Sequence, residues 1–353
     1  MLDSNDKSKV LLSVVIPTYN SGRYLVETLD SLLSQSLPEV EIIVVDDGSD
    51  DDTVQLIQPF RERIIYHYQT NGGLAHARNT GMGISSGEFI AWIDADDLCS
   101  PDRLAMQVDY LARNSSVQLI ASDFVGFDCN GLLEQNNIYS YYQMLKNVRL
   151  DEIFNKRLTI RSTEIPYLSD SGNDVYNVYS GHVWQHLVFG NFLHPPTVMI
   201  RADAARRAGP LREDIPTCED WEFFIRVAKL GMIAFVDSPL IKYRYHPEQM
   251  SSATSSLKKA LSCLRVLKLL MADNPQFVES NTKRFADTQA EFHMAAAYAA
   301  AESSKRTAFK HLFSSLKCGG LRRLPSFGFN LVRIVAAGRL LNLYRQLTKQ
   351  PST

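Results

Sequence analysis

The sequence predicts an α/β fold with a mostly parallel sheet flanked by helices, followed by an all-helical C-terminal region. Short apolar, β-branched runs alternate with segments of helical period over roughly the first 125 residues. This alternation is typical of right-handed βαβ units on a parallel sheet. From residue 253 onward the apolar pattern is helical, and it includes an alanine-rich stretch at 295–301.

The elements of the first 125 residues can be placed in order. Buried strands are expected at 10–16, 40–45, 64–68 and 89–93, and helices at 24–33, 53–60 and 73–84. A further helix is expected to begin near Pro101. Because the carboxyl ends of parallel strands meet at one edge of a sheet, the loops that follow these strands are expected to cluster there.

Residues 129–190 differ in character, because turn-forming residues alternate with aromatic residues and no clean period is visible. A segment this irregular inside a compact domain is usually functional or mobile. Beyond it, a strand is expected at 197–200, a helix beginning at Glu219 and a strand at 233–245. We therefore expect one domain at 1–252, with 129–190 as an insertion, and a helical region at 253–353.

The composition is that of an ordinary soluble protein, with 45% hydrophobic and 22% charged residues. The five cysteines are scattered and form no CxxC pair, so neither a zinc site nor a disulfide framework is indicated, and a reducing cytoplasm is expected. The N-terminal segment lacks the apolar core of a signal peptide. No uncharged apolar run approaches ~18 residues, so no membrane span is expected.

Charge is distributed unevenly along the chain. Residues 303–353 contain ten Lys or Arg and no Asp or Glu, so the rest carries −12 against a net charge of −2 for the whole chain. A basic tail rich in Leu and Phe can contact an anionic membrane surface from the cytoplasmic side. Peripheral membrane contact, a homodimer interface and a plain solvated helical hairpin all fit this tail.

Three carboxylates stand within four positions where the apolar run at 89–93 ends, namely Asp94, Asp96 and Asp97. Like charges this close repel one another unless a cation neutralises them. Mg²⁺ and Mn²⁺ prefer hard oxygen ligands, and ligands of open α/β sheets bind at this edge. The alternative is an acidic turn in which Asp97 or Ser100 caps the following helix.

Three other loops carry residues suited to a nucleotide. Tyr19 follows the first strand, and its ring can stack on a planar base. Asp46 and Asp47 follow the second strand, where a carboxylate can accept a hydrogen bond from an imide N–H. The glycines around Gly72 allow close backbone approach, and Arg78 in the first turns of a helix suits a diphosphate. Taken singly, the acidic pair could be a turn and the glycines a helix entry.

Over residues 9–251, the order of these motifs resembles the inverting family 2 glycosyltransferases, which have a Rossmann-like GT-A fold. The resemblance implies that Asp94 contacts the ribose and Asp96 the metal of a D-x-D element. It also implies a set of residues that bind the nucleotide of a nucleoside diphosphate sugar: Pro17, Thr18, Tyr19, Asp46, Asp47, Gly72, Arg78 and Asp94. One departure is His76, which stands where the family usually has a small residue, and its role stays open.

The family also places a Glu-Asp pair at the start of a helix beneath the acceptor, and Glu219-Asp220 matches it. The resemblance implies that Asp220 is the general base, with Glu219 beside it. An inverting displacement needs one carboxylate to take the acceptor's proton, and a helix N-terminus favours the ionised form. The alternative is that either carboxylate merely caps the helix. Trp221 could form the floor of the sugar site or simply pack.

Further along, residues 243–246 resemble the family element near the diphosphate. His246 could complete the metal shell, and Arg244 could balance charge on the departing nucleoside diphosphate. His194 is a weaker candidate for the diphosphate or acceptor. A histidine after a strand is often structural, so that alternative stays open for both histidines.

Together these motifs predict a metal-dependent inverting glycosyltransferase that uses Mn²⁺ or Mg²⁺. It would move a sugar, preferably from a UDP-linked donor, to a hydroxyl of a glycan or lipid-linked saccharide in cell-surface polysaccharide or glycolipid assembly. No nucleic acid partner is expected, and 129–190 would lie on the acceptor side. One rival is a non-catalytic scaffold that binds nucleotide sugars. The other is a sugar-phosphate nucleotidyltransferase, for which the loop at 18–23 is a poor match.

Overall fold

The computed structural model describes residues 10–35, 37–168, 175–249, 256–301 and 303–320. The chain divides into two compact units, one formed by 1–213 and 219–246 and the other by 214–218 and 247–353. The expected boundary at 252, and most of the basic tail with its proposed membrane or dimer contact, lie outside the described residues.

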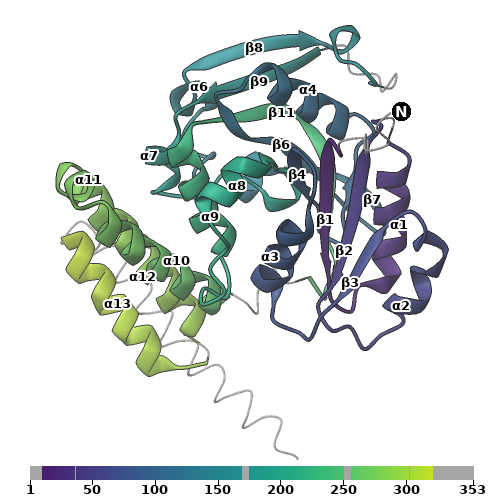
Figure 1. Cartoon of the computed structure of the whole chain (residues 1–353). Helices are drawn as coiled ribbons and strands as arrows, with labels where there is room; N and C mark the ends of the chain where they lie inside the picture. Colours follow the sequence, from purple (N-terminus) through teal and green to yellow (C-terminus); the bar gives the residue numbers. More distant parts are fainter. Residues whose placement is uncertain (1–9, 36, 169–174, 250–255, 302, 321–353) are drawn as a thin grey trace, which may run out of the picture. The chain divides into compact units, whose positions relative to one another are not determined.

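The first unit is built on one mixed sheet (Figure 1). Its strands, in chain order, are β1 Leu12–Thr18, β2 Val40–Asp46, β3 Ile65–Tyr68, β4 Phe89–Trp92, β5 Leu98–Cys99, β6 Val117–Asp128, β7 Gly131–Asn137, β8 Lys156–Arg161, β9 Val175–Gly181, β10 Met199–Arg201 and β11 Met232–Arg244. Across the sheet the order is β3-β2-β1-β4-β10-β6-β11-β9-β8, with β5 paired to β11 and β7 to β6. The expected α/β fold is confirmed.

Strand β1 sets the edge at which the site is built. It is buried throughout, and it pairs in parallel with β2 on one side and β4 on the other. The register places Thr18 opposite Asp46 and Val15 opposite Trp92. The loops that begin at Tyr19, Asp47 and Ile93 therefore leave the sheet at one edge.

The helices of the first unit cover the sheet and begin close to the expected positions. Helices α1 and α3 lie on opposite faces of the strands β1 to β3 (Figure 1). The set comprises α1 Gly22–Leu33, α2 Thr53–Leu56, α3 Leu74–Ile84, α4 Arg103–Arg113, α5 Ile138–Tyr141, α6 Leu150–Ile153, α7 Trp184–Leu187, α8 Ala202–Ala208 and α9 Glu219–Leu230. Short 3-10 turns lie at Gln58–Phe60, Ser162–Glu164 and Pro195–Thr197.

Two parts of the sheet were not anticipated. Strand β6 is absent from the expected elements, although it pairs with β7, β10 and β11. Its residues 117–124 are buried without interruption. The segment 129–190 is more regular than expected, because β8 and β9 form an antiparallel pair from Lys156 to Ser180. Five of the six residues of β8 are exposed, and its two apolar residues, Leu158 and Ile160, give only a short alternation with polar residues.

The second unit is helical, as expected for the C-terminal region. Its described helices are α10 Ser256–Asp273, α11 Pro275–Ser280, α12 Thr282–Ala300 and α13 Lys305–Gly319. Helices α12 and α13 pack through apolar side chains, most of them alanines; the set includes Ala297, Ala308 and Leu312. Within the described part of the chain, none of the helices is both long and apolar enough to span a membrane.

Candidate active site

The loops after β1 and β2 are tied together by a reciprocal pair of hydrogen bonds. Asn20 Nδ2 donates to Asp50 Oδ1 at 2.7 Å, and the Asp50 N–H donates to Asn20 Oδ1 at 2.9 Å. Asn20 has a φ of 50°, in the left-handed region that asparagine tolerates better than most residues. Its backbone N–H also donates to Ser49 Oγ at 2.9 Å. The two nucleotide-side loops therefore have one fixed mutual geometry.

Asp46 is fully buried at the end of β2, and both its carboxylate oxygens accept hydrogen bonds from within the protein. Oδ1 accepts the Ser49 N–H at 2.8 Å, and Oδ2 accepts the hydroxyl of Tyr66 at 2.6 Å. Burial and the negative charge of Asp46 raise the pKa of Tyr66, so the phenol remains a donor. Asp46 therefore shapes the turn that presents its neighbour.

Asp47 joins the second loop to the glycines before α3. Its Oδ1 accepts from Gln69 Nε2 at 2.7 Å and from the Gly72 N–H at 2.9 Å, while Oδ2 accepts the Gly73 N–H at 2.7 Å. Gly73 has a φ of 89°, which favours glycine. A carboxylate offers about four acceptor positions, so three occupied positions leave room for one further donor.

The residues expected to meet the base and ribose lie at the same edge. Tyr19 is 51% exposed beyond the end of β1, whereas Pro17 and Thr18 are buried within the strand. Thr18 Oγ1 is buried and makes no hydrogen bond within the described residues. The exposed ring of Tyr19 is therefore available for stacking, and Thr18 supplies a hydroxyl with unused hydrogen-bonding capacity.

Arg78 lies beneath this edge and connects two acidic motifs. It is 2% exposed, and its Nη2 donates to Asp94 Oδ1 at 2.9 Å while its Nη1 donates to Glu219 Oε1 at 3.4 Å. The guanidinium carbon stands 5.1 Å from the centre of the Trp92 ring. Burial alone would lower the pKa of Arg78, but the acidic neighbours Asp94 and Glu219 raise it. A buried permanent cation thus joins the end of β4 to the start of α9.

The three clustered carboxylates have three different environments. Asp94 is paired with Arg78, and Asp96 is 24% exposed next to His246. Asp97 is fully buried and accepts the backbone N–H of Arg244 at 2.9 Å, while its Oδ2 has no hydrogen-bond partner within the described residues. Burial, followed by the charges of Asp96 and Asp94, raises the pKa of Asp97 well above its usual range. The crowding of charge is therefore expressed at Asp97 as a raised pKa.

Asp96 and His246 come together from positions 150 residues apart, with His246 Nε2 2.9 Å from Asp96 Oδ2. The described residues contain no group of three or more His, Cys, Asp or Glu side chains arranged to hold a metal. Mg²⁺ is commonly held by one or two carboxylates together with substrate phosphates and water. One carboxylate and one imidazole therefore fit a divalent cation whose remaining ligands come from a bound diphosphate.

Arg244 binds the loop that carries the clustered carboxylates. Its Nε donates to the Asp96 carbonyl at 2.7 Å, and its Nη2 pairs with Glu27 at 2.7 Å. The guanidinium carbon also lies 4.9 Å from the centre of the Tyr24 ring, and that ring stands 4.6 Å from the ring of His246. Arg244 thereby places a cation beside Asp96 and fixes the ring next to His246.

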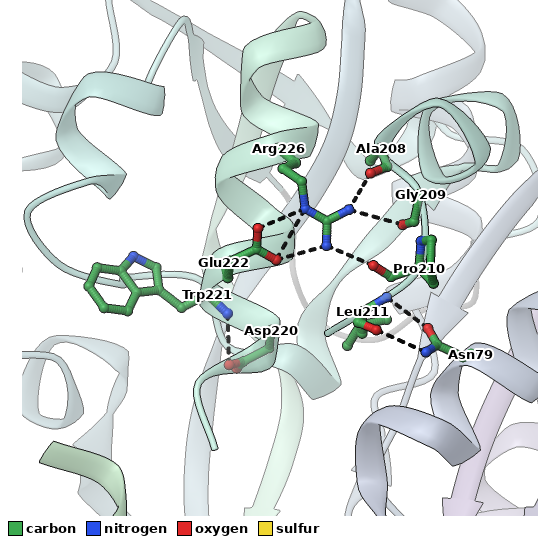
Figure 2. Close-up of polar contacts among 9 residues, drawn as sticks. All are labelled: Asn79, Ala208, Gly209, Pro210, Leu211, Asp220, Trp221, Glu222 and Arg226. Carbon is green, nitrogen blue, oxygen red and sulfur yellow. Dashed lines mark hydrogen bonds and ion pairs between the residues drawn. The ribbon is translucent and has the colours of Figure 1, made fainter. Parts of the chain in front are cut away.

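The Glu219-Asp220 pair opens helix α9, as expected. Asp220 is half-buried, and its Oδ1 accepts the Trp221 N–H at 2.7 Å (Figure 2). Glu219 is buried, and desolvation followed by the charge of Asp220 raises its pKa to about 7. The charge of Asp94 also raises the pKa of Glu219, whereas the neighbouring cation Arg78 opposes the rise.

Comparison with known proteins shows which family the chain resembles. Residues 13–167 match the family model described as glycosyl transferase family 2. Over these residues the chain is of the glycosyltransferase family 2 type. An uncharacterized glycosyltransferase of Rickettsia conorii is 27% identical over 248 residues, which cover 70% of this chain and only 36% of that protein. One of Haemophilus influenzae is 29% identical, covering 69% and 68%.

Solved structures agree with the GT-A fold of this family 2 chain. Staphylococcus aureus TarS 1–349 superposes with a TM-score of 0.56 at 18% identity, covering 95% of this chain and 91% of that one. TarS has also been solved with UDP-GlcNAc, at a TM-score of 0.51 and 16% identity, covering 88% and 89%. A mannosyltransferase of Pyrobaculum calidifontis with GDP-Man and Mn²⁺ superposes with a TM-score of 0.55 at 19% identity, covering 96% and 82%.

Two residues expected with less support to bind the diphosphate or the acceptor, His194 and Trp221, lie in packed surroundings. His194 is buried among aromatic rings, 4.5 Å from Phe124 and 4.7 Å from Tyr243 between ring centres. Trp221 is also buried, and its indole N–H donates to the Leu187 carbonyl at 2.6 Å. Packing explains both side chains. His76, whose role was open, is half-exposed and lies 3.1 Å from Glu213.

Two residues that the motifs do not single out, Arg226 and Asn79, hold the segment that precedes α9 (Figure 2). Arg226 on α9 pairs with Glu222 and donates to the Ala208, Gly209 and Pro210 carbonyls. Asn79 on α3 donates to the Leu211 carbonyl at 3.0 Å and accepts the Leu211 N–H at 2.8 Å. Asn79 directly follows Arg78, so its position beside a site residue was the only local signal.

Proposed function

We propose that the chain is an inverting glycosyltransferase that moves a sugar from a nucleoside diphosphate sugar, UDP-linked by preference, to a hydroxyl of a glycan or lipid-linked saccharide. The observation that carries the proposal is the bridge made by Arg78. It binds Asp94, the carboxylate assigned to the ribose, and Glu219, the neighbour of the proposed base. A single buried cation therefore fixes the donor side relative to the acceptor side.

On the donor side, the nucleotide rests on the edge formed by β1, β2 and β4. Tyr19 stacks on the base, and the fourth acceptor position of Asp47 takes its imide N–H. Asp94 accepts from a ribose hydroxyl through the oxygen that does not bind Arg78 Nη2. Bound UDP-GlcNAc in TarS and GDP-Man in the archaeal mannosyltransferase support a nucleoside diphosphate sugar as the donor class.

On the acceptor side, Asp220 takes the proton of the acceptor hydroxyl as that oxygen attacks the anomeric carbon from the face opposite the leaving group. One displacement inverts the centre, so no covalent intermediate forms. Protonation of Glu219, whose pKa is raised to about 7, removes a negative charge beside Asp220. General base catalysis of this kind contributes about 10²–10⁴-fold.

The leaving nucleoside diphosphate carries the charge that develops in the reaction. Asp96 and His246 would hold Mn²⁺ or Mg²⁺, which neutralises a diphosphate when bound. Mn²⁺ in the archaeal mannosyltransferase supports this assignment. Arg244 lies beside Asp96 and adds positive charge at the same place.

The acceptor and the setting are proposed from the sequence. A hydroxyl of a cell-surface polysaccharide or glycolipid precursor fits a cytoplasmic enzyme whose basic tail contacts the inner membrane face or a second copy of the chain. Sedimentation with anionic vesicles and light scattering separate these two uses of the tail. Binding to the vesicles that disappears on removal of 321–353 supports membrane contact.

The proposal is tested by the release of nucleoside diphosphate from UDP-, GDP- and dTDP-sugars, with Mn²⁺, Mg²⁺ or a chelator. We expect slow turnover of one donor that falls about 10²–10⁴-fold in Asp220→Asn and is lost in Asp96→Ala. Asp203→Asn, which changes an exposed side chain of α8, is the matched control and should keep the parent rate. Full activity in Asp220→Asn would refute the assignment of the base.

Two other outcomes distinguish the rival functions. A donor that binds but is not turned over in the presence of candidate acceptors would favour a nucleotide-sugar-binding scaffold. Release of pyrophosphate from a nucleoside triphosphate and a sugar phosphate would favour a nucleotidyltransferase. If no nucleotide sugar binds, the proposed function is wrong.

A further inference from the structure

Two cysteines that the proposed reaction does not use lie in contact within the second unit. Cys218 Sγ and Cys263 Sγ are 3.4 Å apart, although the residues are 45 positions apart in the sequence. Both side chains are partly exposed, so a small oxidant can reach them. Cys263 lies in α10, and Cys218 immediately precedes Glu219 in the chain.

The segment 214–218 is held against α10 at more than this one point. Asp214 pairs with Arg265, two residues after Cys263 in α10. Ile215 is buried, with 1% of its surface exposed. Cys218 itself has a φ of 65°, a conformation that a residue with a Cβ adopts when its surroundings impose it. The Asp214–Arg265 ion pair and the contact between the two sulfurs therefore both hold this segment to α10.

We propose that Cys218 and Cys263 form a redox site that a peroxide closes to a disulfide and a dithiol reopens. One thiolate attacks a peroxide oxygen, which gives a sulfenic acid and one water. The second thiol then attacks the sulfenic sulfur, so that an S–S bond forms and a second water leaves. Two thiols lose two electrons to one hydrogen peroxide. The sulfurs need to approach only by about an ångström to reach the bonded distance.

A disulfide at this position acts on the proposed base through the chain. Cys218 is joined by a peptide bond to Glu219, so its attachment to α10 restrains the backbone that leads into Glu219-Asp220. Placement errors of about an ångström can cost on the order of 10²-fold in rate. This consequence rests on the proposed function, and we expect sugar transfer to fall at least about 5-fold on oxidation.

The redox site is tested by peptide mapping without reductant after graded hydrogen peroxide treatment of the full chain. We expect a Cys218–Cys263 linked peptide and the loss of two thiols per chain in the parent and in the exposed-cysteine control Cys129→Ser. The linked peptide should be absent from Cys218→Ser and Cys263→Ser. Sulfinic acid at either residue without the linked peptide, or cross-linked chains in its place, would overturn the proposal.

The effect on transfer is measured on the same samples. The parent should lose transfer on oxidation and regain it with dithiothreitol, whereas Cys263→Ser should be unaffected by either. Equal rates for reduced and fully bridged parent would overturn the control of activity. If the bridge forms but neither state turns over any donor, the proposed function fails and the redox site stands.

Discussion

Two acidic regions of the site contrast sharply. Asp46 and Asp47 are buried at the end of β2, and the hydrogen bonds that they accept come from uncharged groups: backbone N–H groups, a phenol and an amide. Asp94 and Asp96 instead have Arg78 and His246 as their partners. The first pair is stabilised by neutral donors, whereas the second group is stabilised by cations.

The contrast indicates that the two regions have different roles. Neutral donors fix the shape of a loop and respond little to added charge. A group of carboxylates and cations arranged around the buried Arg78 responds to every change of charge, because interactions between charges strengthen when water is partly excluded. The raised pKa values of Asp97 and Glu219 follow from burial in that second region. We therefore expect the first region to set binding geometry and the second to set chemistry and pH dependence.

The largest expected effect is at Arg78. Its replacement by methionine leaves Asp94 and Glu219 without their buried counter-ion, which costs about 3–5 kcal/mol of unfolding free energy near pH 7. The deficit should shrink in acid, where these carboxylates are protonated. Urea unfolding at several pH values measures both effects. Arg113→Met, which removes an exposed partner of Asp109, should change stability by less than about 1 kcal/mol. A similarly small loss in Arg78→Met would contradict the contrast.

The second expected effect is the pH dependence of stability caused by Glu219. Burial, followed by the charge of Asp220, raises its pKa from 4.5 to about 7, so the folded protein holds this proton more tightly than the unfolded chain. The stabilisation is complete below about pH 4.5 and is lost as the pH rises through about 7, by roughly 3 kcal/mol. Glu219→Gln should remove this dependence in urea titrations.

Asp123 provides an internal reference for that measurement. Burial raises its pKa to about 6, so part of the dependence below pH 6 should persist in Glu219→Gln. The interval between pH 6 and 7 is therefore the diagnostic one. An unchanged slope there would show that Glu219 is not the group responsible.

The third effect tests the neutral region. Asp47→Asn replaces one acceptor oxygen by a donor facing either the Gly72 or the Gly73 N–H group, which should cost about 1–3 kcal/mol. The loss should be nearly independent of pH between 6 and 8. Asp50→Asn is the exposed control and should lose less. A strong pH dependence of the stability lost in Asp47→Asn would contradict the proposed difference between the two acidic regions.

The smallest effect concerns base stacking on the exposed ring of Tyr19. Removal of the ring in Tyr19→Ala should weaken nucleotide binding by about 1 kcal/mol, or ~5-fold in Kd measured by calorimetry with UDP. Tyr19→Phe keeps the ring and should bind as the parent does. Stability should be unchanged in both variants, because this residue is 51% exposed. Equal affinity in Tyr19→Ala would remove Tyr19 from the nucleotide site.

Much of the fold could be predicted from local patterns. The strands β1, β2 and β4 are short, buried, β-branched runs, and each ends within two residues of the expected position. Strand β8 escaped prediction although Leu158 and Ile160 alternate with polar residues, because an alternation this short is a weak signal within a segment rich in turn-forming residues. Antiparallel β10 lies between β4 and β6, a placement that depends on pairing between distant segments.

The sequence by itself determined which chemical groups stand at the ends of the strands and at the start of α9. Strand periodicity and the parallel register are local or nearly local properties, so they place Tyr19, Asp47 and Asp94 at one edge. Motif order was then enough to indicate the family.

Only the tertiary structure decided how these groups interact. The joining of Asp94 to Glu219 by Arg78, the meeting of Asp96 with His246 and the contact between Cys218 and Cys263 all unite distant segments. Desolvation and charge interactions depend on everything packed around a group, not on its neighbours in the chain. For this reason the same residue type, aspartate, is tied to neutral donors at Asp47, paired with a cation at Asp94 and buried with a raised pKa at Asp97.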